Sequence, residues 1–184
     1  MSAQDISQAT VIERNAPPRA SAAFMRRHPS RWIALGFGSG LSPIAPGTVG
    51  TLWAWMTFLV LDYWLDDAAW GAVIGASMAL GVWACTRCAQ DLAVADPGAI
   101  VWDEVLAFWI VLWVVMPTPW WAQLIAFVLF RAFDVAKPGP VGWVDKRFKS
   151  ARGWMLGVGI LADDLVAALC TLLVIAAWHF VFAS

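Results

Sequence analysis

The feature that most constrains this chain is a series of apolar runs, several of them close to the length of a membrane-spanning helix. A helix needs roughly 20 apolar residues to cross a bilayer, and three runs approach that length, namely Thr48–Leu65, Ala68–Ala84 and Leu165–Phe182. Two shorter runs, Val105–Met116 and Trp120–Leu129, flank a proline-rich break. Because 61% of the residues are hydrophobic and only 14% are charged, the composition is that of a membrane protein. We therefore predict an all-α, polytopic membrane helical bundle with about five apolar segments, in which the middle two either span the bilayer or form a short or tilted hairpin.

The distribution of cations predicts how these segments are oriented. If the amino terminus is inside and five segments alternate, all twelve Lys and Arg residues fall in the chain up to Gly50, in residues 85–104 and in residues 131–164. The two outer loops carry acidic residues and no cation. This positive-inside pattern places the three basic stretches in the cytoplasm. Residues 1–34 lack the apolar region of a signal peptide, and we predict that they form a disordered, basic cytoplasmic tail before a membrane-embedded domain of residues 35–184.

Three charged motifs lie at the ends of apolar runs on the predicted cytoplasmic side, and they are Arg131/Asp134/Lys137, Asp103-Glu104 and Asp163-Asp164. Arg131 and Asp134 are neighbours on a helix, and the proline after Lys137 ends that helix. Charged residues beside a membrane-length segment are costly unless they pair or act on a ligand. The sequence therefore predicts that these motifs, which are distant along the chain, meet at one surface.

Such a surface suits the chemistry of a phosphate group. Carboxylates at one place can hold Mg²⁺, which can orient a phosphate, neutralise its charge and activate water for attack. Lys137 and Arg131 would bind phosphate oxygens. The glycine-rich stretch Gly36–Gly50 leads into an apolar run whose helix Thr48 could cap, and backbone N–H groups there would suit an anion. Together with interfacial tryptophans, these parts favour phosphoryl transfer from a lipid phosphate to water.

Each motif also has an ordinary structural explanation, which the sequence leaves open. Asp163 could cap the last helix, and Asp103-Glu104 could complement a helix dipole. Arg131 and Asp134 could form only a local ion pair. For the whole chain, the alternative to an enzyme is a non-enzymatic small membrane transporter or ion-binding protein. Transporters place charges near the bilayer midplane and often carry repeated halves, whereas this chain shows no internal repeat.

Four stretches together resemble one known family: GSGLSPIAPGTVGTL at 38–52, DPGAIVWDEV at 96–105, FRAFDVAKPGPVGWVD at 130–145 and GVGILADDLVAA at 157–168. They resemble bacterial phosphatidylglycerophosphatase A, in the family's order and over most of the chain after residue 35. The resemblance implies a Mg²⁺-dependent, multi-pass enzyme of the bacterial inner membrane with its active site facing the cytoplasm. It would remove the terminal phosphate from phosphatidylglycerophosphate to give phosphatidylglycerol in phospholipid biosynthesis, and we expect metal-assisted attack by water.

The resemblance also implies which residues act, and the expected acidic and basic positions are Asp103, Glu104, Asp134, Lys137, Asp163 and Asp164. For Mg²⁺ we expect the ligands Asp103, Glu104, Asp163 and Asp164. For the substrate phosphate we expect Arg131, Ser42, Gly47 and Thr48. Which carboxylate orients water stays open. The chain departs from the family at Ala107, at Gly139 and in a longer link after Asp145. The expected partner is a phospholipid in the membrane, with no nucleic acid, and an oligomer stays open.

Overall fold

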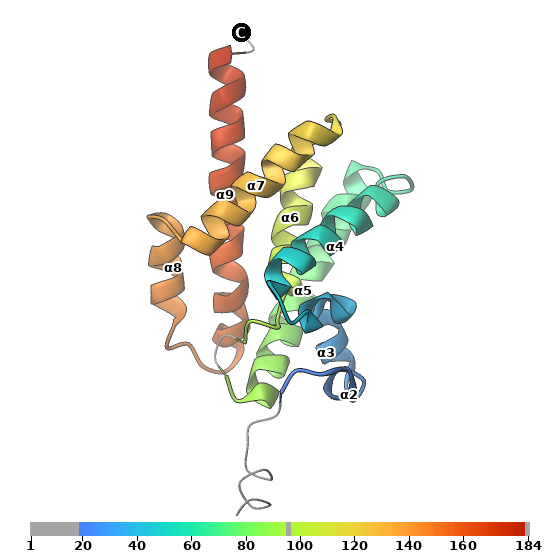
Figure 1. Ribbon diagram of the computed structural model, residues 1–184, viewed down its shortest axis with the longest axis vertical. Helices are drawn as coiled ribbons and strands as arrows, with labels where there is room; N and C mark the ends of the chain where they lie inside the picture. The colour runs from blue at the N-terminus through green and yellow to red at the C-terminus, as the bar shows by residue number, and fades with distance from the viewer. Residues whose placement is uncertain (1–18, 95–96, 183–184) are drawn as a thin grey trace, which may run out of the picture.

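The structure is a bundle of helices around one buried helix. The computed structural model describes residues 19–94 and 97–182, and this part of the chain contains helices and no strand (Figure 1). The helices are α2 (Ala22–Met25), α3 (Pro29–Ala34), the 3₁₀ helix η1 (Gly36–Leu41), α4 (Pro46–Leu61), α5 (Asp67–Leu92), α6 (Trp102–Val115), α7 (Trp120–Ala136), α8 (Pro140–Phe148) and α9 (Trp154–Phe182). The all-α prediction is confirmed for the described residues.

Helix α6 is the core of the bundle. It has 14 residues and is apolar on every side after the acidic pair in its first turn, and it packs against α4, α5, α7 and α9. Its fully buried side chains are Val105, Leu106, Ala107, Phe108, Val111 and Leu112. A helix that is apolar all round is stable only where neighbours cover it all round. The central position of α6 holds its first turn, and the acidic residues on it, in the middle of the molecule.

Two helices, α5 with 26 residues and α9 with 29, are long and apolar enough to cross a membrane. They pack closely because glycines remove side chains from the contact. A Cβ on Gly157 would overlap the Val82 carbonyl, and the Gly157 N–H donates to Thr86 Oγ1 at 3.0 Å. The carboxyl-terminal part of α9 extends beyond the other helices (Figure 1). Helices α4, α6 and α7 have 16, 14 and 17 residues, so five complete spans stays a prediction.

The start of α9 differs from the sequence prediction. An apolar helix was expected from Leu165, directly after Asp163-Asp164, but α9 begins at Trp154. Gly157 and Gly159 do not break it, because each lies where α9 approaches another element, Gly159 facing the Phe148 side chain. Asp163 and Asp164 consequently lie about 14 Å along the helix, at 1.5 Å per residue, and not at its end.

The amino-terminal segment is also more ordered than predicted. For Ser21–Ala34 the prediction of disorder is wrong, because α2 and α3 are helical and bury Phe24 and Met25. Arg31 is held by an ion pair with Asp91 on α5, at 2.9 Å. Apolar contacts together with this ion pair offset the entropy of ordering the segment. Residues 1–18 of the predicted tail lie outside the described residues.

Candidate functional site

The charged motifs that were expected to meet do meet. They line one cavity of about 590 Å³, whose walls come from the start of α4, from α6, α7 and α8 and from the amino-terminal part of α9. The predicted residues in its lining are Gly47, Asp103, Glu104, Arg131, Asp134, Lys137, Asp163 and Asp164. Because these residues are separated by up to 117 positions in the sequence, between Gly47 and Asp164, only the packing of α4, α7 and α9 on α6 brings them together.

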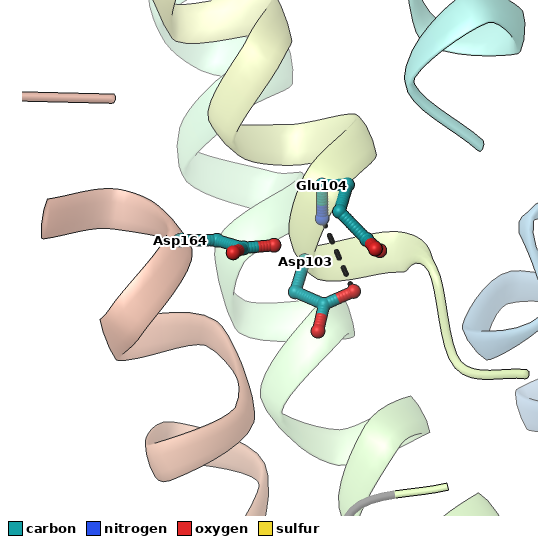
Figure 2. Close-up of side chains that lie close together, drawn as sticks. All are labelled: Asp103, Glu104 and Asp164. Atoms are coloured by element: carbon teal, nitrogen blue, oxygen red, sulfur yellow. Dashed lines mark hydrogen bonds between the residues drawn. The ribbon is translucent and has the colours of Figure 1, made fainter. Parts of the chain in front are cut away.

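Three of the carboxylates that line this cavity lie close together. Asp103 and Glu104 lie in the first turn of α6, and Asp164 projects toward them from α9 (Figure 2). One carboxylate oxygen from each lies within 4.8 Å of the others. The Glu104 N–H donates to Asp103 Oδ1 at 3.1 Å, which is the dashed line in Figure 2. Placement at a helix amino terminus favours Asp103 and Glu104, but it does not account for a third carboxylate arriving from another helix.

The surroundings of these carboxylates disfavour their charged forms. Burial, together with the charges of Glu104 and Asp164, raises the pKa of Asp103 well above its ordinary value. Burial also raises the pKa of Glu104 to about 6, although Arg131 acts in the opposite direction. Glu104 Oε2 is buried and has no hydrogen-bond partner. Buried like charges with an unpartnered oxygen are a favourable setting for a cation.

The donor set fits Mg²⁺. Three carboxylates supply only oxygen atoms, which Mg²⁺ prefers, and Mg²⁺ commonly uses a few carboxylates while keeping waters and phosphate oxygens as further ligands. The cavity has room for Mg²⁺ together with a phosphate group. Among its described lining residues six are acidic and three are cationic, so a divalent cation would reduce a net negative charge.

Arg131 lies beside this group. Its guanidinium donates to Asp134 on the same helix and lies 3.5 Å from Glu104 Oε1. The local Arg131–Asp134 ion pair that the sequence left open therefore exists, but Arg131 also reaches a second helix. Gly47 makes this approach possible, because a Cβ there would overlap Glu104 Oε1 and contact the Arg131 guanidinium.

Lys137 enters the cavity from the end of α7. The helix ends at Ala136 as predicted, and Lys137 follows in the left-handed region with φ of 44°. Its ammonium donates to Asp145 Oδ1 at 2.6 Å and to Asp163 Oδ2. Burial alone would lower the pKa of Lys137, but the hydrogen bonds and charges of Asp145 and Asp163 outweigh it and raise the pKa above its ordinary value. The ammonium thus stays charged.

Asp163 is the expected metal ligand that stands apart. It lies inside α9, which excludes the alternative that it caps the helix. It lines the cavity, but it is not in the group of three whose oxygens lie within 4.8 Å, and it accepts from Lys137 instead. Its position is suited to holding the ammonium in place.

The structure does not bring Ser42 and Thr48 into the cavity. Ser42 Oγ donates to the Ile44 carbonyl. The prediction that Thr48 caps a helix is wrong, since α4 begins two residues earlier with Pro46 and has Ala45 at the N-cap position. From the glycine-rich stretch only Ala45, Pro46 and Gly47 line the cavity.

Most of the other glycines in that stretch serve packing. A Cβ on Gly40 would overlap the Ala99 carbonyl, and a Cβ on Gly50 would overlap the Val101 side chain. Close packing therefore accounts for Gly40 and Gly50, and Gly47 is the glycine of this stretch that shapes the site.

Sequence reasoning missed Asp145 and Lys149, which also line the cavity. Both belong to the basic stretch of residues 131–164. Asp145 lies on α8, which begins at Pro140 and places Asp145 against Lys137, and Lys149 follows directly after that helix. The available signal was that Asp145 is an acidic residue among four nearby cations, just after a Pro-Gly-Pro turn.

Comparisons with known proteins show which family this chain is similar to. The family model described as Phosphatidylglycerophosphatase A matches residues 32–179. Phosphatidylglycerophosphatase A of Escherichia coli strain K12 is 41% identical over 141 residues, which cover 76% of this chain and 77% of the relative. Phosphatidylglycerophosphatase A of Haemophilus influenzae is 35% identical over 148 residues, covering 80% and 87%. A relative from Bacteroides thetaiotaomicron, 35% identical over 150 residues and covering 78% and 89%, carries a provisional name as a phosphatidylinositol-3-phosphatase. No solved structure matches this chain significantly.

Proposed function

The chain belongs to the phosphatidylglycerophosphatase A family, and we propose that it hydrolyses phosphatidylglycerophosphate to phosphatidylglycerol and phosphate. The observation that carries the proposal is the single cavity in which Asp103, Glu104 and Asp164 lie together beside a charged Lys137. A cation-binding group of carboxylates next to a phosphate-binding cation is an arrangement suited to metal-assisted phosphate hydrolysis.

In the proposed site, Asp103, Glu104 and Asp164 hold Mg²⁺. The ion would supply neutralisation of the phosphate charge and a lowered pKa for water, and both effects favour hydrolysis at neutral pH. Asp163, which was expected among the ligands, instead has a positioning role toward Lys137.

The remaining charged residues bind and orient the substrate. Lys137 binds the terminal phosphate as a point charge, and Asp145 and Asp163 hold its ammonium at the cavity from two sides. Arg131 is kept in place by Asp134 and Glu104, and its planar guanidinium can bind a second phosphate oxygen. No Cys, His or Ser is among the described residues that line the cavity, which supports direct attack by water over the use of one of those side chains as a nucleophile.

We further propose that the protein is a multi-pass protein of the bacterial inner membrane, with the cavity on the cytoplasmic side. Helices α5 and α9 are the best candidates for spans. After Asp164, α9 continues as an apolar run to Phe182 that is about 27 Å long, close to the thickness of the hydrocarbon core. The cytoplasmic orientation is supported by the location of the basic residues.

The test is release of phosphate from phosphatidylglycerophosphate by the purified protein in detergent. We expect release with Mg²⁺, loss of release in excess EDTA, and recovery when Mg²⁺ is restored. Phosphatidylinositol 3-phosphate serves as the comparison substrate, and faster release from it would replace the proposed substrate. A folded protein that releases phosphate from neither lipid would favour the transporter or ion-binding alternative.

A further inference from the structure

We propose that a second cavity beside the candidate active site is an exit site that binds inorganic phosphate after hydrolysis, with Arg152 and Lys149 as its cationic ligands. The cavity has a volume of about 520 Å³. One wall is the end of α5, with Ala89, Gln90, Ala93 and Val94, and the other is the connection from α8 to α9. The role as an exit rests on the proposed function, because the phosphate is the product of that reaction.

The two cavities are neighbours that share part of their walls. Lys149 and Leu156 line both of them. A phosphate released near Lys137 therefore meets Lys149 at the boundary, and Arg152 lies beyond it in the second cavity. No other cationic residue lines the second cavity among the described residues.

The charges favour transfer in this direction. The first cavity has six acidic and three cationic side chains in its described lining, whereas the described lining of the second has two cations and no acidic residue. In the described part of the chain, Arg31, Arg87, Arg131 and Lys137 all form ion pairs, but none is found for Lys149 or Arg152. A phosphate anion leaving a carboxylate-rich site is attracted to such cations.

The position also suits a water-soluble product. The second cavity lies at the end of α5 and before the start of α9. Both lie away from the projecting, apolar carboxyl-terminal part of α9 (Figure 1). Phosphate therefore leaves toward the proposed cytoplasmic side, while the lipid product stays on the membrane side.

The test compares Arg152→Gln with Arg147→Gln. Both arginines are exposed and both substitutions remove one positive charge, but Arg147 lines neither cavity. Binding of radiolabelled inorganic phosphate is measured by equilibrium dialysis of the full chain in detergent, with EDTA present to remove metal-dependent binding. We expect Arg152→Gln to weaken phosphate binding about 10-fold, through loss of a charge-assisted hydrogen bond. Arg147→Gln should leave it unchanged, and Arg152→Lys should retain most of it.

A second measurement is inhibition of turnover by added inorganic phosphate at constant ionic strength. The inhibition constant should rise about 10-fold in Arg152→Gln with an unchanged KM for the lipid. Equal effects of Arg147→Gln and Arg152→Gln, or no effect of either, would overturn the exit site. An Arg152→Gln effect that appears only when phosphatidylglycerol is varied in the micelle would assign the cavity to a lipid phosphodiester and overturn it as well.

The dialysis needs no turnover, so the two proposals can fail separately. Arg152-dependent phosphate binding in a protein that hydrolyses no lipid would refute the proposed function and the exit role while leaving the phosphate site. Lipid hydrolysis without Arg152-dependent binding would refute the exit site alone.

Discussion

Two groups of three acidic residues differ sharply in their surroundings. Asp62, Asp66 and Asp67 lie within six positions of one another at the turn between α4 and α5, and they find local partners or solvent. Asp66 accepts from the Ala69 N–H at the start of α5, and Asp62 accepts from Trp70 Nε1. Asp103, Glu104 and Asp164 come from two helices, lie within 4.8 Å of one another, and leave Glu104 Oε2 buried without a partner.

The difference separates a structural role from a ligand-binding one. A carboxylate that caps a helix is stabilised by its own backbone, so the group at the α4–α5 turn needs nothing further. Like charges that are crowded and buried cost stability until a cation joins them. Of these two acidic groups, only Asp103, Glu104 and Asp164 form an arrangement that costs stability by itself. Substitutions at the two places should have opposite consequences.

The largest effect is expected for the central carboxylates. Glu104→Gln or Asp164→Asn should lower phosphate release from phosphatidylglycerophosphate by about 10³-fold or more, because each removes a charged ligand of the proposed Mg²⁺. Thermal unfolding in EDTA should show each variant at least as stable as the wild type, since a buried charge has been removed. Near-normal turnover in both variants would mean that this group holds no catalytic ion.

The next effect is expected for the cation of the site. Lys137→Gln should lower turnover about 100-fold, because a charged phosphate ligand is lost. Asp145→Asn should lower turnover by only about 10-fold, because Asp163 still accepts a hydrogen bond from the Lys137 ammonium. Steady-state phosphate release measures both. If Asp145→Asn were the more damaging of the two, Asp145 would act directly on the substrate and not through Lys137.

A smaller effect is expected where α4 approaches the site. Gly47→Ala adds a Cβ that overlaps Glu104 Oε1, so it should displace that carboxylate and cost about 1–3 kcal/mol of stability or a corresponding loss of turnover. Gly75→Ala is the control, because a Cβ there meets nothing within 4 Å. In the interior of α5 it should stabilise by about 0.5–1 kcal/mol. Thermal unfolding and phosphate release are measured for both variants in detergent. If Gly47→Ala and Gly75→Ala had the same stability and turnover, the close approach at Gly47 would be contradicted.

The sequence predicted the elements of the site better than its details. Helix content and the meeting of the charged motifs followed from apolar runs and from the placement of cations, which are properties of single segments. The role of Gly157 could not be predicted in the same way. A glycine before an apolar run resembles a helix breaker, and only the position of Val82 on α5 shows that Gly157 permits close packing inside a helix.

Asp145 and Arg31 were mispredicted for the same reason as Gly157, because their roles depend on contacts between elements. Asp145 became a partner of Lys137 only because the chain turns after α7 and α8 packs on α9. Arg31 was predicted to lie in a disordered tail, but it donates hydrogen bonds to Asp91, which is 60 positions later in the chain. Both depend on contacts between elements, which a pattern within one segment does not contain.

The smallest effect on activity is expected at the α4–α5 turn. Asp66→Asn should leave turnover unchanged and stability nearly so, because asparagine caps a helix about as well as aspartate. Asp66→Ala should also leave turnover unchanged but should cost about 1 kcal/mol of stability through loss of the cap to the Ala69 N–H. Phosphate release and the midpoint of thermal unfolding, measured on the same samples, separate the two roles. A large loss of turnover in Asp66→Asn would place the chemistry at this end of the molecule, and with it would reverse both the proposed orientation and the contrast between the two acidic groups.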